Sequence, residues 1–152
     1  MTPSQNLFDK LKQWEGCILH AYQDSAGIWT IGIGSTLYPD GSHIKEGDVI
    51  TLDRAFELLK WEVNNKTAAV SGLLHNVSVN QNQFDSLVSL TYNIGVSGFA
   101  NSTVLKRVKI NPNDPHIADA FLMWDKIHKD GKLIESEGLK YRRQKEIELY
   151  FS

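Results

Sequence analysis

The sequence predicts an α+β fold, and three observations support the prediction. A short helical pattern opens the chain, two extended runs joined by a turn follow it, and the remainder shows the periodicity of amphipathic helices. The chain has 152 residues, 41% of them hydrophobic, so it can bury the core of one compact domain, 1–152. We therefore expect a small lobe built on a β-hairpin and a larger helical lobe within that domain.

The first helix is expected over residues 2–15. Thr2 stands where an N-cap would precede a proline at the first helical position, Pro3, and Gly16 is typical of a residue that ends a helix. This places Glu15 at the end of a short helix, where the helix dipole disfavours a negative charge.

A β-hairpin is expected next. Two extended runs, 18–22 and 28–31, flank the turn-rich segment 24–27. Gly32 and Gly34 would weaken an ordinary strand, so they indicate either a bulge or a place where another group approaches the backbone closely.

Helix-start signals divide the rest of the chain. N-cap or first-turn residues precede each helical pattern at Thr51, Asn80, Ser102, Asp114-Pro115 and Ser136. The helix that opens at Asp114 is expected to turn Ile127 inward. The β-containing lobe would then cover about 13–50, a bridging helix about 51–73 and the helical lobe about 74–152, with helix 2–15 packing near the cleft between the lobes.

The composition argues against several kinds of partner. The formal net charge is −2 at pH 7, which disfavours nucleic acid and anionic membranes. The single cysteine, Cys17, cannot form an internal disulfide. No metal is expected, because the five histidines form neither an i, i+4 pair nor a cluster with cysteine. The first residues show no signal peptide and no membrane span.

Two acidic residues and a threonine are candidates for glycosidic bond cleavage. That reaction needs one carboxylic acid to protonate the leaving oxygen and a second carboxylate to activate water or stabilise positive charge. Glu15 at a helix end, Asp24 in the hairpin turn and Thr30 on the second strand could share one cleft. The alternative for any such pair of acids is a role as solvated surface groups.

The chain resembles the bacteriophage-type lysozymes, the endolysin muramidases. The segments that carry the resemblance span nearly the whole chain and occur in the family's order: 14–16, 21–24, 27–34, 83–88, 92–95, 98–99, 101–103, 138–143 and Glu146. The resemblance implies a lysozyme-like fold with the active-site cleft between the two lobes. It also implies that Glu15 is the general acid, Asp24 activates or orients water, and Thr30 holds that water.

Further roles follow from the same resemblance. Gly34, Thr36, Asn93 and Ser102 match polar or open positions suited to hydrogen bonding with sugars, and the alternative for each is a helix cap or turn residue. Arg142 falls where relatives have an arginine near the catalytic glutamate, so it is a candidate for positioning Glu15.

One alternative and one departure accompany these roles. Arg142 and Arg143 could instead solvate the last helix. Relatives often have histidine where this chain has Ser35, so any hydrogen bond or salt bridge made by that histidine would be weaker or absent.

The function implied is hydrolysis of the β-1,4 bond between N-acetylmuramic acid and N-acetylglucosamine in peptidoglycan. The expected enzyme needs no cofactor, acts as a monomer on glycan strands, and does not insert stably into membranes. We expect it to be made in the cytoplasm of a bacterial host and to act on the wall after release across the membrane. The alternatives are a lytic transglycosylase, which has no water for Asp24 and Thr30 to place, and a catalytically silent wall-binding module.

Overall fold

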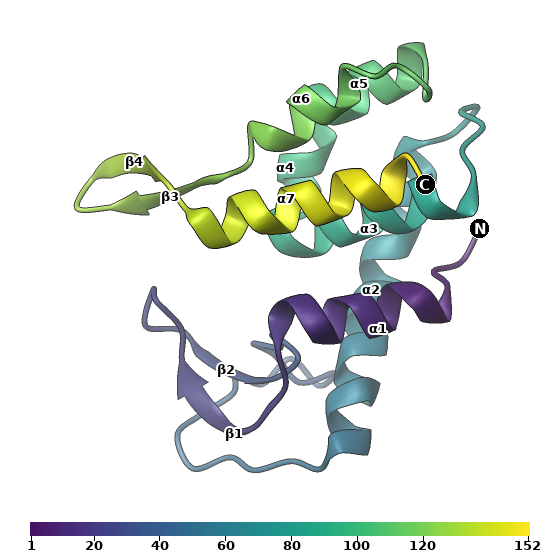
Figure 1. Ribbon diagram of the computed structural model, residues 1–152. Helices are drawn as coiled ribbons and strands as arrows, with labels where there is room; N and C mark the ends of the chain where they lie inside the picture. The colour runs from purple at the N-terminus through teal and green to yellow at the C-terminus, as the bar shows by residue number, and fades with distance from the viewer. The chain divides into compact units, whose positions relative to one another are not determined.

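The computed structural model describes residues 1–152, which form two compact units (Figure 1). One unit consists of Ser4–Asn65, and the other joins Met1–Pro3 to Lys66–Ser152. The mixture of helices with two small antiparallel sheets confirms the predicted α+β class. The prediction of a single domain stays a prediction, and each unit is described by itself.

The first helix of the unit Ser4–Asn65 begins later than predicted. Helix α1 (Gln5–Glu15) is capped by Ser4, whose hydroxyl accepts a hydrogen bond from the Leu7 backbone N–H at 3.3 Å. The predicted start at Thr2 and Pro3 is wrong: Ser4 is an equally good capping residue, and the helix begins after it. The end at Gly16 is confirmed by that residue's φ of 74°.

The predicted hairpin is confirmed. Strand β1 (Ile18–Gln23) pairs with β2 (Trp29–Gly32) in an antiparallel ladder, and a register shift between Ile18 and Tyr22 marks a bulge in β1. The buried residues Ile31, Ile44 and Leu58 join the hairpin, the loop after it and a helix into one hydrophobic cluster.

Helix α2 (Leu52–Leu73) contributes residues to both units, because the boundary between them falls within it. Thr51 caps α2 as predicted, with its hydroxyl accepting from the Arg54 N–H at 3.1 Å. None of the helices combines the length and the apolar composition that a membrane crossing requires.

The unit that contains Lys66–Ser152 is mainly helical. Its remaining elements, in chain order, are α3 (Gln81–Ile94), α4 (Val96–Ala100), α5 (Thr103–Ile110), α6 (Ile117–Leu122), β3 (Lys126–Lys129), β4 (Lys132–Glu135) and α7 (Glu137–Tyr150). Helix α3 packs against α7, and α6 contacts both α5 and α7. The capping box of Asn80 with Gln83 and the caps at Ser102 and Ser136 are confirmed.

A second hairpin in this unit was not expected. Strands β3 and β4 pair through an Asp130-Gly131 turn and extend away from the neighbouring helices (Figure 1). Ile127, predicted to face inward from a helix that starts at Asp114, lies instead on β3 with 37% of its surface exposed. That helix begins only at Ile117, and the Asp-Gly dipeptide between two short runs is the hairpin signal that overrides the helical spacing.

Candidate active site

The carboxyl group of Glu15 lies against the backbone of Gly34. Glu15 is the last residue of α1 and is half-buried. A Cβ atom placed on Gly34 would lie 3.0 Å from Glu15 Oε2 and 3.3 Å from its Cδ, and Gly34 also has a φ of 78°. Only glycine therefore leaves room for the carboxyl group without strain. The close approach predicted from the glycine pattern is confirmed at this position, and the approaching group is Glu15.

Asp24 is held at the turn of the first hairpin by its own backbone. Its Oδ1 accepts hydrogen bonds from the N–H groups of Ala26 at 2.8 Å and Ile28 at 2.9 Å. The side chain is exposed, and Oδ2 makes no hydrogen bond within the protein. One oxygen therefore fixes the orientation of the carboxylate while the other remains available to accept from a water molecule.

Thr30 presents a hydroxyl whose proton is already engaged. The residue is 5% exposed on β2, and its Oγ1 donates to the carbonyl of Ile28 at 3.0 Å. Because a hydroxyl has one proton and two lone pairs, this oxygen can act toward further partners only as an acceptor.

Tyr22 is a residue of this site that the sequence reasoning missed. It lies directly opposite Thr30 in the β1–β2 ladder, so the two side chains share one face of the hairpin. Burial raises the pKa of Tyr22 above its ordinary 10.0, and the negative charges of Glu15 and then Asp24 raise it further. The phenol is therefore neutral at ordinary pH, and the charges of both carboxylates affect its pKa. The sequence signal that could have identified Tyr22 is its position two residues before Asp24.

Ser35 and Thr36, the two residues after Gly34, lie in different environments. Thr36 is half-buried, and its carbonyl accepts from the Ile44 N–H at 3.4 Å. Ser35 is fully buried, and its hydroxyl oxygen has no hydrogen-bond partner. The expectation that a contact made by histidine in relatives is weaker or absent here stays a prediction.

The other predicted residues belong to the second unit. Asn93 is exposed in the last turn of α3, and its Oδ1 accepts from Arg143 Nη2 at 2.6 Å. Ser102 is 2% exposed, with its hydroxyl donating to the Phe99 carbonyl at 2.7 Å and accepting from the Leu105 N–H at 3.1 Å. The capping role of Ser102 is thus confirmed, while contact of either residue with sugar stays a prediction.

Arg142 and Arg143 do not solvate the last helix. They are 6% and 0% exposed, respectively, and both form ion pairs with Glu146, a fully buried residue of the same helix, α7. The solvating alternative is therefore wrong, because an ionic cluster with α3 occupies both guanidinium groups. A role of Arg142 in positioning Glu15 stays a prediction.

The unit Ser4–Asn65 thus holds Glu15, Asp24, Thr30, Gly34 and Thr36. It offers one carboxyl group in a confined place and a second with an open oxygen, which is the pair that hydrolysis of a glycosidic bond requires, and an acceptor hydroxyl besides. No group of three or more histidine, cysteine, aspartate or glutamate side chains is arranged to hold a metal ion.

Comparison with known proteins places the chain in a family. The profile of the phage lysozyme family matches residues 12–146. The endolysin of Salmonella phage P22 is 43% identical over 152 residues, which cover 100% of this chain and 99% of that protein. The endolysin of Acyrthosiphon pisum secondary endosymbiont phage 1 is 39% identical over 93% of this chain and 92% of its own length.

Solved structures agree with this assignment. The endolysin from Escherichia coli O157:H7 phage FAHEc1 matches with a TM-score of 0.94 and 41% identity, over 100% of this chain and 94% of that chain. A mutant of P22 lysozyme matches with a TM-score of 0.81 and 43% identity, over 100% and 99% of the two chains. The chain therefore belongs to the phage lysozyme family and is a peptidoglycan-lytic glycoside hydrolase.

Proposed function

We propose that the chain is an endo-acting muramidase that hydrolyses the β-1,4 bond between N-acetylmuramic acid and N-acetylglucosamine. In this proposal Glu15 is the general acid, and Asp24 and Thr30 place the attacking water. The observation that carries the proposal is the Glu15 carboxyl group seated against Gly34, where any side chain would displace it.

Glu15 suits the part of proton donor because its position is fixed. A general acid must lie within hydrogen-bond reach of the leaving oxygen, and small displacements of such a group are costly to the rate. The close approach of Gly34 restricts this carboxyl group on one side, because Glu15 Oε2 would lie 3.0 Å from a Cβ on that residue.

Asp24 and Thr30 suit the placement of water because both offer acceptors. Asp24 Oδ2 is open, and Thr30 Oγ1 has already given its proton to the Ile28 carbonyl. A water molecule that donates one proton to each of them would direct its remaining lone pairs outward, toward the anomeric carbon of a bound sugar. An inverting mechanism uses such a water, activated by the second carboxylate.

The cellular role is part of the same proposal. The relatives named above are phage endolysins, and a further relative, from Haemophilus phage HP1, is named a SAR-endolysin. We expect this chain to be made in the cytoplasm of a bacterial host and to act as a monomer on the wall after release across the membrane. Light scattering during size-exclusion chromatography measures the oligomeric state.

Mass spectrometry of digested sacculi tests the reaction. Hydrolysis adds water and leaves reducing ends, which borohydride converts to alditols. A lytic transglycosylase would instead leave anhydro sugars that borohydride does not reduce. We expect reducible products with the wild type and their loss with Asp24→Asn. Anhydro products, or unchanged hydrolysis by Asp24→Asn, would contradict the proposal.

A further inference from the structure

A buried ionic cluster joins α3 to α7. Glu146 is fully buried, with its Oε1 2.9 Å from Arg143 Nε and its Oε2 3.3 Å from Arg142 Nε. Ser89 on α3 donates its hydroxyl proton to Glu146 Oε2 at 2.5 Å. Removing one member of such a cluster leaves a buried charge without its counterpart, so the cluster holds its side chains in one arrangement.

Arg143 reaches from this cluster to Asn93. Its Nη2 donates to Asn93 Oδ1 at 2.6 Å, and Arg143 is 0% exposed while Asn93 is exposed. A guanidinium group has five donors and no acceptor, so only the oxygen of an amide can face it. The amide nitrogen of Asn93 is therefore on the side away from Arg143.

We propose that Arg143 is a positioning residue that fixes Asn93 with its amide nitrogen outward, so that Asn93 recognises hydrogen-bond acceptors on the glycan. This inference rests on the proposed function. A freely rotating amide could present either a donor or an acceptor, whereas the fixed amide of Asn93 presents only donors.

The ligand chemistry follows from this polarity. The carbonyl oxygen of an N-acetyl group only accepts hydrogen bonds, so it matches the Asn93 nitrogen. A de-N-acetylated amino sugar carries an ammonium group, which only donates and is repelled from a donor. Asn93 therefore favours N-acetylated glycan over its deacetylated counterpart.

Asn93→Asp is the sharpest test because it keeps the shape of the side chain while it exchanges the outward atom and adds a negative charge. Aspartate keeps an oxygen toward Arg143 and replaces the outward nitrogen with an oxygen, which accepts instead of donating. We expect the melting temperature to be retained or raised. Binding of N-acetylated chitohexaose should weaken about 10-fold, while binding of the fully deacetylated hexamer should strengthen. Asn93→Ala should weaken binding of the N-acetylated hexamer without strengthening binding of the deacetylated one.

Calorimetric titration of each variant with both oligosaccharides gives the preference ratio. A merely structural role for Asn93 would lower stability and leave this ratio unchanged. An unchanged ratio in Asn93→Asp would overturn the inference, and so would a large loss of stability, because aspartate should serve Arg143 at least as well as asparagine. Failure of the wild type to cleave sacculi would instead contradict the proposed function, so the two failures are distinguishable.

Discussion

Replacing Gly34 with alanine perturbs the seat of the Glu15 carboxyl group directly. The new Cβ would lie 3.0 Å from Glu15 Oε2, and ordinary contacts begin at 3.4 Å, so the carboxyl group must move by about 0.4 Å or more. Since a misplacement of about 1 Å can cost about 100-fold in rate, we expect kcat to fall about 10-fold.

The same substitution also strains the backbone. Gly34 has a φ of 78°, where a residue with a Cβ costs about 1–2 kcal/mol. In a chain of this size each kcal/mol lowers the melting temperature by about 2–4 °C, so most of the variant remains folded at 25 °C. Loss of lysis per folded molecule can then be separated from loss of folded protein.

Gly41→Ala is the matched control. Gly41 lies in the same unit with a φ of 87°, and a Cβ there would meet nothing within 4 Å. It should therefore lose similar stability while keeping full activity in a turbidity assay on permeabilised Gram-negative cells. Equal activities of Gly34→Ala and Gly41→Ala, corrected for the folded fraction, would refute the proposed seating of Glu15.

Three further results are expected. Ser35→Ala should raise the free energy of unfolding by about 1 kcal/mol in urea titrations, because it removes a buried hydroxyl without a partner; a clear loss of stability would show that this hydroxyl is satisfied. Ser102→Ala should cost about 1 kcal/mol through the lost cap, and a raised KM would support the predicted sugar contact, whereas unchanged activity per folded molecule would contradict it. In NMR titrations the pKa of Tyr22 should fall toward 10.0 in Glu15→Gln, and less in Asp24→Asn, because each loses a negative charge near the phenol. An unchanged pKa of Tyr22 in both variants would show that the carboxylates lie elsewhere. The raised pKa of Tyr22 also means that its contribution to stability is complete below about pH 10 and is lost as the pH rises through the pKa of the folded state.

Local chemistry made much of the fold predictable. Caps act within three residues of themselves, so Thr51, Asn80, Ser102 and Ser136 could be read directly as helix starts. Ser4 shows the limit of this reasoning, because Thr2 and Ser4 are both good capping residues and local sequence does not distinguish between them.

The second hairpin shows where periodicity misled. Ile127 continued a helical spacing, yet the Asp130-Gly131 turn adopts positive φ at both residues and pairs β3 with β4. A short apolar pattern fits both the period of a helix and that of a strand. The residues of the turn therefore had to distinguish the two.

Candidate site residues could be named from the sequence, but their contacts could not. The sequence motif pointed to Glu15, Asp24 and Thr30 through family resemblance, and the glycine pattern indicated a close approach at Gly34. Which group approaches Gly34 depends on how α1 returns to the hairpin, which no local signal specifies. The bond between Arg143 and Asn93 joins residues on two helices far apart in sequence and was equally inaccessible.

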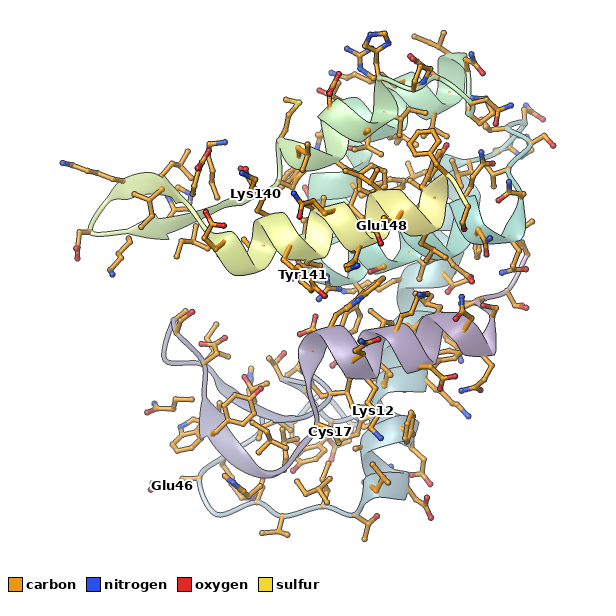
Figure 2. All side chains as sticks on the ribbon, in the orientation of Figure 1. Lys12, Cys17, Glu46, Lys140, Tyr141 and Glu148 are labelled. Carbon is orange, nitrogen blue, oxygen red and sulfur yellow. The ribbon has the colours of Figure 1, made fainter.

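Glu15→Gln, measured against Glu46→Gln, tests the central claim most directly. Glu46 is an exposed acid of the same unit that points outward from its loop (Figure 2), so both variants remove one negative charge. General acid catalysis contributes about 100- to 10,000-fold. We predict that the rate at which Glu15→Gln lyses sacculi falls by at least about 100-fold while its melting temperature is retained. Glu46→Gln should lyse sacculi at the rate of the wild type. Full lytic activity in folded Glu15→Gln would contradict the assignment of Glu15 as the general acid.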